Sequence, residues 1–270
     1  MLVDSTVRVT LIVPTLNEGS GIAHVLEEFG TATRTANATT FARDPIDWRV
    51  LVVDGASTDD TAERARAAGA TVLVEPRRGY GRAYLTGFAA ADGEFLATLD
   101  GDGTYPAAEV PRFVARLRDQ NLDFITCSRL ESVDRRAMTT EHRIGNWFLN
   151  FLARVAYHRF LKELPGKGLV DSQSGMWIFR RAILPRLRLT QEGMAFSEEL
   201  KLEVLLNGLR FEEVPIHYAE RWGAPKLSSW RDGYHNMLFL VRKRLAVARA
   251  LKDGSIRTVP SNHAAGSIPR

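Results

Sequence analysis

Two aspartates separated by one glycine, Asp100 and Asp102, follow directly on a short apolar run at residues 95–99. The run predicts a buried parallel strand, because it is continuous, apolar and bounded by turn residues. Ligands of an open α/β sheet bind just beyond the carboxyl ends of such strands. Two carboxylates there repel each other unless a cation lies between them, and Mg²⁺ and Mn²⁺ commonly bridge carboxylates to substrate phosphates. The motif alone leaves two interpretations open, a metal site or a solvated acidic turn.

Polar side chains also follow the first two predicted strands. Asn17 and Glu18 come after the apolar run at residues 7–13, and Asp54 ends the run at residues 50–54. Carboxylates at strand ends accept hydrogen bonds from a ribose hydroxyl or a base N–H. Each of them alone is equally compatible with helix capping, but as a set at one sheet edge they favour a shared nucleotide site. The chain lacks the glycine patterns of the usual dinucleotide and P-loop sites, which argues against both.

The elements that carry these residues alternate between strands and helices. The first half predicts strands at residues 7–13, 50–54, 71–74, 95–100 and 123–128, helices at 20–29, 60–68, 82–91 and 107–119, and an irregular loop at 31–45. Such alternation predicts a parallel sheet with right-handed crossovers. The second half predicts helices at residues 142–164, 198–207 and 230–251, strands at 176–179 and 211–218, and a glycine-bearing loop at 166–175. Ser20 and Ser197 are expected to cap the helices that follow them.

The composition indicates a globular protein. Of the 270 residues 45% are apolar and 25% charged, and the single cysteine, Cys127, excludes an intrachain disulfide and favours a buried structural thiol. The net charge of +4 is compatible with phosphorylated substrates or anionic lipids. No aromatic and basic strand pattern typical of an RNA-binding sheet is present, so we expect no nucleic-acid partner. A spanning run and a signal peptide are absent from the sequence, which predicts a cytoplasmic protein.

Several motifs, in this order along the chain, resemble those of the family 2 glycosyltransferases of the GT-A fold. The carriers are V-T-L-I-V-P-T-L-N-E at residues 9–18, V-V-D-G-A-S-T-D-D-T at 52–61, G-Y-G-R-A at 79–83 and D-G-D at 100–102. Within that family the chain is most similar to polyprenyl-phosphate sugar synthases of the dolichol-phosphate mannose synthase type. That narrower resemblance rests on C-S-R at residues 127–129, D-S-Q-S-G-M at 171–176 and the segment at 213–227.

The resemblance implies an α/β protein with a Rossmann-like mixed sheet flanked by helices and a nucleotide-diphosphate sugar, with GDP or UDP, as donor. It assigns a GT-A catalytic domain to residues 1–230. The sequence pattern predicts an amphipathic basic helix at 231–251, and a composition rich in Gly, Ser, Pro and Ala predicts a disordered tail at 252–270. Asp100 and Asp102 would hold Mg²⁺ or Mn²⁺ against the diphosphate, where the ion neutralises charge on the departing group. The other residues that it implies for donor and substrate binding are Pro14, Asn17, Glu18, Asp54, Ser57, Gly79, Gly101 and Ser174.

The acceptor implied by the narrower resemblance is a lipid monophosphate. A phosphate is ionised at neutral pH, so no strong base is required, and paired N–H donors of arginine orient it. Arg129, Arg143, Arg221 and Lys226 match the positions for that role, with Arg129 also placed among the catalytic residues. Pro225 stands where the subgroup usually has serine, which puts the shape of this loop in question.

Two other functions stay open. A family 2 enzyme that acts on a hydroxyl needs a general base, and Glu199, in the pair Glu198–Glu199, is the candidate for it. The same pair also makes an ordinary helix start. The third function is a non-catalytic nucleotide-sugar-binding module, against which the acidic strand ends argue.

Two helical segments, at residues 147–161 and 237–245, mix apolar and basic residues in the manner of helices that lie in a membrane interface. Core packing with a solvated basic face is an equally good explanation of either segment. We expect peripheral attachment to a membrane, aided by a partner or a homodimer.

Overall fold

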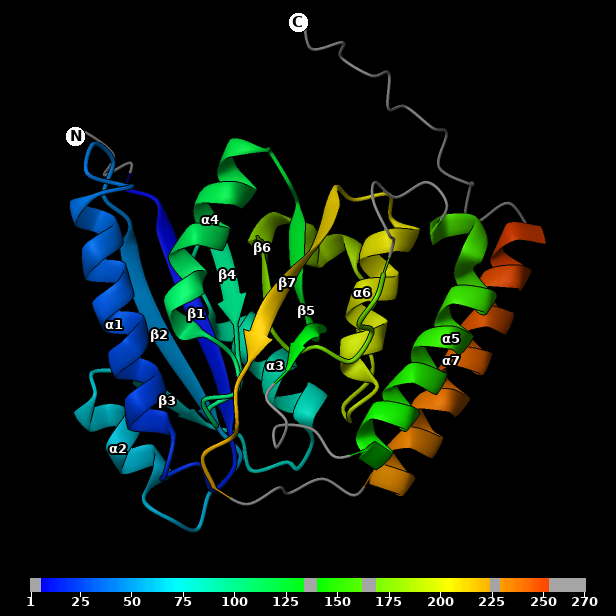
Figure 1. Ribbon diagram of the computed structural model, residues 1–270, viewed down its shortest axis with the longest axis horizontal. Helices are drawn as coiled ribbons and strands as arrows, with labels where there is room; N and C mark the ends of the chain where they lie inside the picture. Colours follow the sequence, from blue (N-terminus) through cyan, green and yellow to red (C-terminus); the bar gives the residue numbers. More distant parts are fainter. Residues whose placement is uncertain (1–5, 134–139, 162–168, 224–228, 253–270) are drawn as a thin grey trace, which may run out of the picture.

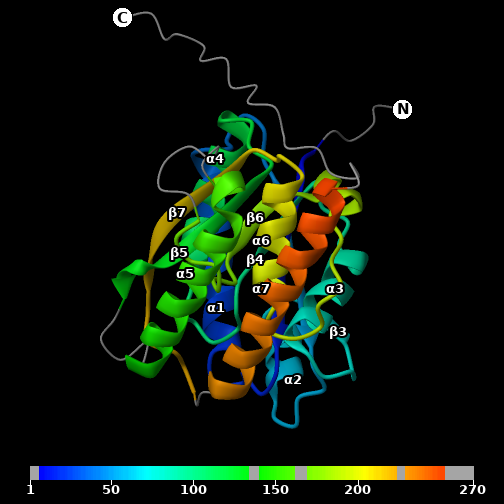
Figure 2. The same cartoon turned by 90° about the vertical axis from the view of Figure 1, so that its right-hand side faces the viewer.

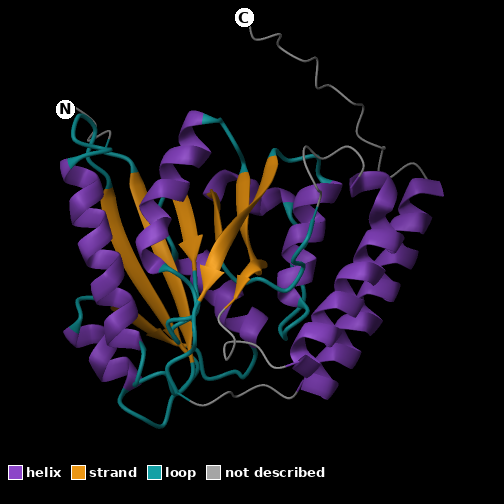
Figure 3. Ribbon diagram, in the orientation of Figure 1, coloured by secondary structure: helices purple, strands orange, loops and turns teal. Residues whose placement is uncertain are grey.

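A seven-stranded sheet with helices on both faces forms the body of the molecule (Figure 1, Figure 3). This computed structural model describes residues 6–133, 140–161, 169–223 and 229–252. The strands are β1 (Arg8–Thr15), β2 (Asp47–Asp54), β3 (Thr71–Val74), β4 (Phe95–Thr98), β5 (Phe124–Val133), β6 (Trp177–Arg180) and β7 (Phe211–Tyr218). The helices are α1 (Ile22–Ala38), α2 (Thr61–Ala67), α3 (Tyr80–Ala90), α4 (Val110–Asp119), α5 (Thr140–Leu161), α6 (Phe196–Leu206) and α7 (Ser229–Lys252), with short 3₁₀ turns at Ala107–Glu109 and Arg181–Arg186.

The strand order β3-β2-β1-β4-β6-β5-β7 is mixed, because β6 runs antiparallel to both of its neighbours. The other strands pair in parallel. The carboxyl ends of those strands and the amino end of β6 therefore meet at one edge of the sheet, the lower edge in Figure 1. This edge collects the loops that carry most of the residues expected to do chemistry.

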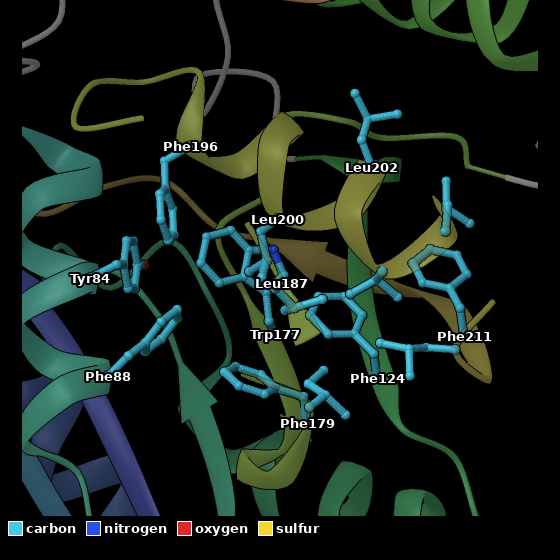
Figure 4. Close-up of a cluster of buried hydrophobic side chains, with 14 of the residues drawn as sticks. Tyr84, Phe88, Phe124, Trp177, Phe179, Leu187, Phe196, Leu200, Leu202 and Phe211 are labelled. Atoms are coloured by element: carbon cyan, nitrogen blue, oxygen red, sulfur yellow. The ribbon is translucent and has the colours of Figure 1, made fainter. Parts of the chain in front are cut away.

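Two apolar cores lie on the two faces of the sheet. On one face α1, α2 and α4 pack against alternate residues of the strands, such as Val9, Leu11 and Val13 of β1. On the other face α3 and α6 pack against the opposite set, and aromatic rings including Tyr84, Trp177 and Phe196 fill the space between them (Figure 4). Cys127 is buried, and burial raises the pKa of its thiol, as expected for a structural cysteine.

Helices α5 and α7 pack side by side outside α6, at the flank of the sheet away from β3 (Figure 1, Figure 2). Large apolar side chains remain exposed on this pair, namely Trp147, Phe148, Phe151, Val155, Tyr234, Val241 and Leu245. No helix in the described ranges has both the length and the apolarity needed to cross a bilayer.

The structure corrects several of the predicted boundaries. Residues 31–45 are not an irregular loop throughout, because α1 continues to Ala38. Phe29, Thr33 and Ala36 keep a helical spacing toward the core, which the Thr/Ala-rich composition hides. Neither predicted serine cap forms: Gly21 precedes α1, and α6 begins at Phe196, so Ser197 lies inside the first turn. The expected tail lies almost entirely outside the described residues.

Candidate active site

A cavity of 680 Å³ opens at the sheet edge where the parallel strands end. Its walls come from the loops after β1, β2, β3 and β4, from Arg129 on β5, from the loop before β6 and from Tyr218 on β7. Of the residues expected to bind substrate, those that line it are Pro14, Glu18, Gly79, Asp100, Gly101, Arg129 and Arg221. Residues from both halves of the chain thus meet around one cavity.

The two aspartates after β4 differ in their surroundings. Asp102 is buried, and its carboxylate accepts hydrogen bonds from Thr104 N at 3.0 Å and Thr104 Oγ1 at 2.7 Å, and an ion pair from Arg221 at 2.7 Å. The half-buried Asp100 makes no hydrogen bond or ion pair within the described part of the chain. Burial and the charge of Asp102 raise the pKa of Asp100 to about 7. The charges of Arg129 and Arg221 offset only part of this rise, so Asp100 is a carboxylate whose repulsion is incompletely compensated.

The donor set at this point suits a divalent ion shared with a substrate. No cluster of three or more acidic, histidine or cysteine side chains in the described ranges could hold a metal by itself. Mg²⁺ usually takes one or two carboxylates and fills its remaining positions with water and phosphate oxygens. An unpaired Asp100 beside Asp102 fits that pattern.

A strap at residues 219–223 covers the loop that carries the aspartates. Trp222 N donates to the backbone oxygen of Asp102 at 2.8 Å, and the indole ring lies 5.1 Å from the ring of His24. Gly103 has a φ of +77°, and a Cβ there would lie 2.5 Å from Trp222 Cδ1. A glycine is therefore needed at this position both for the backbone conformation and for the close approach of the indole.

Three residues expected to bind the donor instead join the loops after β1 and β2. Asp54 is buried and accepts hydrogen bonds from Thr15 Oγ1 and from the N–H and hydroxyl of Ser57. Asn17 N donates to Ser57 Oγ at 2.8 Å, and Asn17 Oδ1 accepts from the N–H of Thr58 at 2.8 Å. None of the three is among the residues that line the cavity. In this structure their contacts hold together the loops after β1 and β2, parts of which line the cavity.

The sequence analysis missed an acidic and basic pair after β3. Glu75 accepts hydrogen bonds from Arg77 and from Thr86 Oγ1, and the Arg77 guanidinium lowers the pKa of Glu75 to about 2. Glu75, Arg77 and Arg78 all line the cavity. Their signal was available, because Glu75 follows directly on a strand as Asp54 and Asp100 do.

Arg129, which also lines the cavity, is held by a buried carboxylate. Asp171 accepts hydrogen bonds from Arg129 N at 3.0 Å, Nε at 2.8 Å and Nη2 at 2.9 Å. The charge of Arg129 lowers the pKa of Asp171 to about 2 despite its burial. The ring of Tyr218 lies 5.5 Å from the guanidinium carbon. These contacts fix a positive charge at the cavity wall.

The D-S-Q-S-G-M loop contributes further polar groups. Gln173 lines the cavity and donates to Glu198, while Asn236 on α7 donates to Gln173 Oε1 at 2.9 Å. The hydroxyl of Ser174 is buried with no hydrogen-bond partner among the described residues, and Ser174 is not part of the cavity wall. Tyr80, Tyr105, Met194 and His235, which the sequence analysis did not single out, complete the wall.

The structure places Glu199 away from the cavity wall. Its carboxylate accepts hydrogen bonds from Thr190 N at 2.7 Å, Thr190 Oγ1 at 2.8 Å and Gln191 N at 2.8 Å. Glu199 thus anchors the loop before α6. Glu198 has one oxygen unpaired within the described chain, but burial raises the pKa of its carboxyl well above the usual value. Glu198 is not among the residues that line the cavity.

Two of the expected phosphate ligands are not described. Arg143 lies on α5, but its side chain is outside the described residues, and Lys226 is outside them altogether.

Comparisons with known proteins identify the family. The family model described as glycosyl transferase family 2 matches residues 10–188. The hexosyltransferase Agl6 of low-salt glycan biosynthesis in Haloferax volcanii is 33% identical over 242 residues, which cover 88% of this chain and 54% of that protein. The dolichyl-phosphate hexose transferase of the same organism is 33% identical over 184 residues, 68% of this chain and 75% of that protein.

A solved structure with the same fold is glucosyl-3-phosphoglycerate synthase from Mycobacterium tuberculosis, in a complex with Mn²⁺, UDP and glucosyl-3-phosphoglycerate. The two superpose with a TM-score of 0.64 at 20% identity, over 88% of this chain and 79% of that one. The likeness confirms the expected GT-A fold with its mixed sheet. The chain therefore belongs to glycosyl transferase family 2, the family that its motifs resemble, and it is a glycosyltransferase.

Proposed function

We propose that this protein is a metal-dependent, inverting glycosyltransferase that moves a hexose from a nucleotide-diphosphate sugar (UDP or GDP) to a polyprenyl phosphate. The observation that carries the proposal is the charge pattern of one cavity. Asp100, a carboxylate with no hydrogen-bond partner in the described chain, lies at the strand ends that hold nucleotides in α/β sheets, and a fixed arginine, Arg129, lines the same cavity. The first group suits a metal-bound diphosphate and the second an anionic acceptor.

Asp100 and Asp102 are the residues that would hold Mg²⁺ or Mn²⁺. When bound, such an ion supplies a Lewis acid that stabilises negative charge on the departing diphosphate. The loops after β1, β2 and β3 form the end of the cavity for the nucleoside. Arg77, Arg78 and Gly79 line the cavity after β3 and belong to that end.

Transfer to a phosphate needs no general base. An oxygen of the acceptor phosphate forms the bond to the anomeric carbon, while the bond from that carbon to the diphosphate breaks and its electron pair leaves with the nucleoside diphosphate. The attacking oxygen carries no proton at neutral pH. Arg129 orients the phosphate and Arg221 adds a second positive charge at the cavity.

The lipid nature of the acceptor is supported by the relatives. Besides the dolichyl-phosphate hexose transferase, an undecaprenyl-phosphate 4-deoxy-4-formamido-L-arabinose transferase of Enterobacter is 25% identical over 239 residues. The commitment of Glu199 to the loop before α6, and the absence of both Glu198 and Glu199 from the cavity wall, argue against a hydroxyl acceptor. In this proposal residues 1–230 form the catalytic domain, and the exposed apolar side chains on α5 and α7 attach it peripherally to the membrane that contains the acceptor.

A panel of radiolabelled UDP- and GDP-sugars tests the proposal, with polyprenyl phosphate and Mn²⁺, scored by extraction into organic solvent. We expect one donor to deliver label to the organic phase. Arg129→Met, which breaks the ion pair with Asp171, should abolish that label. Arg210→Met is the control, because it breaks a different arginine–aspartate ion pair, the one with Asp123, and should leave the label unchanged. Label confined to a water-soluble glycoside would show a hydroxyl acceptor, and absence of donor turnover with every donor would favour a non-catalytic protein.

A further inference from the structure

Helix α6 carries a fully buried lysine for which the proposed reaction has no direct use. The helix is buried on every side, because α3 and the sheet lie against it on one side and α5 and α7 on the other (Figure 1). Lys201 lies in its middle with 0% of its surface exposed. Lysine is almost never fully buried unless its ammonium group is paired, so the partners of Lys201 indicate its role.

The ammonium of Lys201 holds one peptide carbonyl. Lys201 Nζ donates to the backbone oxygen of Asp171 at 2.6 Å. From β7, Glu213 accepts hydrogen bonds from the backbone N–H of Asp171, at 2.8 Å, and from that of Val170. A fully buried lysine from a helix and a half-buried glutamate from a strand therefore hold the backbone on both sides of Asp171.

The clamped residue is the one that aims Arg129. Asp171 accepts three hydrogen bonds from Arg129, through its N, Nε and Nη2 atoms, and a fourth from Gln173 N at 3.1 Å. Arg129 Nη1 takes no part in these bonds and remains for a ligand of the cavity that Arg129 lines. The direction of the guanidinium thus depends on Asp171, and the position of Asp171 depends on Lys201.

The cluster balances its charges. Arg129 and Lys201 oppose Asp171 and Glu213, and Arg129 itself lines the cavity. Burial lowers the pKa of Lys201 to about 8, and the two carboxylates oppose that shift. Replacing a buried ion cluster by apolar residues is often neutral or favourable for stability, so what such a cluster supplies is a fixed geometry.

We propose that Lys201 is a positioning residue for the acceptor site: by fixing Asp171 it aims Arg129 at the acceptor phosphate. This inference rests on the proposed function, which assigns the acceptor phosphate to Arg129. Lys201 itself touches no substrate.

Three variants test the inference. Lys201→Met keeps the length of the side chain and removes the donor, and Lys201→Arg restores a charged donor. Lys243→Met is the matched control, because Lys243 is also largely buried and its ammonium pairs with a carboxylate of α6, Glu203, away from Arg129. We expect Lys201→Met to raise the KM for polyprenyl phosphate at least tenfold and to leave the affinity for UDP or GDP with Mn²⁺ within twofold. Lys201→Arg should recover most of the loss, and Lys243→Met should show none of it.

A second measurement does not depend on the acceptor. The Nε–H signal of Arg129 in ¹H–¹⁵N spectra, assigned by its disappearance in Arg129→Lys, reports the bond to Asp171. We expect it to be sharp and protected in the wild type and in Lys243→Met, and shifted and rapidly exchanging in Lys201→Met. An unchanged signal in Lys201→Met, or an equal change in Lys243→Met, would overturn the inference. If instead Arg129→Lys leaves the KM for the acceptor unchanged, the proposed function fails, and the signal still decides whether Lys201 positions Arg129.

Discussion

At the scale of single residues, Asp100 and Asp102 have different tasks before any ligand binds. Asp102 holds its own loop and the strap through Thr104 and Arg221. Asp100 makes no hydrogen bond within the described chain, and its burial and its repulsion by Asp102 and Glu18 outweigh its attraction to Arg129 and Arg221. A group that does not stabilise its own protein and lies in a cavity is a candidate for ligand binding.

Replacing Asp100 by asparagine should therefore separate function from stability. We expect Asp100→Asn to lower turnover by on the order of 10²- to 10³-fold, because a charge that helps to hold the ion against the departing diphosphate is lost. The melting temperature without metal should stay the same or rise, because a repelled buried charge is removed. Calorimetric titration with Mn²⁺ and UDP or GDP, together with thermal denaturation, measures both effects.

Asp102→Asn is the control for this prediction. It removes the charge that pairs with Arg221, so it should lower the melting temperature as well as the turnover. If Asp100→Asn were destabilised as much as Asp102→Asn, Asp100 would have a structural role that its lack of partners does not suggest.

Candidate site residues could be predicted from the sequence where they follow a recognisable strand or lie in a family motif. Asp100, Asp102 and Arg129 were found because they follow apolar runs or lie in family motifs. Glu75 satisfies the same rule after β3 and was missed, because one carboxylate without a motif around it carries little information. The pairing of Arg129 with Asp171, 42 residues away, and of Asp171 with Lys201 is set by the packing of β5 against α6 and its neighbours, which no local pattern encodes.

At the scale of elements, the strap at residues 219–223 packs against Gly103, where both the positive φ and the close approach of Trp222 require a glycine. We expect Gly103→Ala to destabilise the protein by about 2–3 kcal/mol, because it combines a strained φ with a clash against Trp222. Gly69→Ala is the matched control: Gly69 has a φ of +86°, and a Cβ there would have nothing within 4 Å, so only the strain of about 1 kcal/mol applies.

Chemical denaturation of the two variants measures their free energies of unfolding, and the difference between them is the cost of the clash with the Trp222 indole. Gly103→Ala should also weaken nucleotide binding, because the loop with the aspartates must shift, whereas Gly69→Ala should not. Equal destabilisation by the two substitutions would mean that the strap moves aside freely.

The buried Lys201 on α6 should make the free energy of unfolding depend on pH. The pKa of Lys201 is about 8 in the folded protein and 10.5 in the unfolded chain, so between these values the unfolded state binds more protons. The free energy of unfolding contributed by this group therefore rises with pH, by up to about 3 kcal/mol from pH 8 to 10.5. Denaturation of the wild type and of Lys201→Met at several pH values isolates the effect, since all other groups titrate in both. A difference between the two that stays flat over this range would contradict the assigned pKa.

Elements were predicted well where periodicity was strong and poorly where composition misled. The strand at residues 211–218 was predicted with its observed boundaries, and β3 likewise. Helix α1 was cut short because its second half is rich in threonine and alanine, although Phe29, Thr33 and Ala36 face the core. Burial against the sheet decides such a case, and burial is a property of the fold.

At the scale of the whole molecule, most of the exposed large apolar side chains lie on one flank, on α5 and α7. Phe151 is 50% exposed on α5, and Val74 is 48% exposed on β3 at the opposite edge of the sheet. If α5 and α7 face a membrane, Phe151→Glu should reduce co-sedimentation with anionic liposomes several-fold at low salt, because it puts a charge into the apolar contact. Val74→Glu adds the same charge at the other edge and should leave binding unchanged.

Equal loss of liposome binding in both variants would show a general effect of charge, and no loss in either would mean that α5 is covered by protein instead. Binding by the wild type should weaken as salt rises, because part of it is electrostatic.

The overall architecture could be predicted from the order of strands, helices and motifs, but the direction of β6 could not. Alternating strands and helices predicted the parallel part of the sheet. That the sheet also contains an antiparallel strand was implied only by the family resemblance. The reversal of β6 between β4 and β5 has no signal in four residues of strand, because a short apolar run does not state its direction.

The strap also gives the protein a built-in optical probe. Trp222 lies against Gly103, next to the aspartates, and Trp147 is exposed on α5, on the flank proposed to meet lipid. Because indole emission responds to polarity and to nearby paramagnetic ions, Mn²⁺ with a nucleotide should quench Trp222, and vesicles should shift the emission of Trp147 to shorter wavelength. Fluorescence of Trp222→Phe and Trp147→Phe would thus separate the two signals: the quenching by Mn²⁺ and nucleotide should disappear in the first variant, and the vesicle-induced shift in the second.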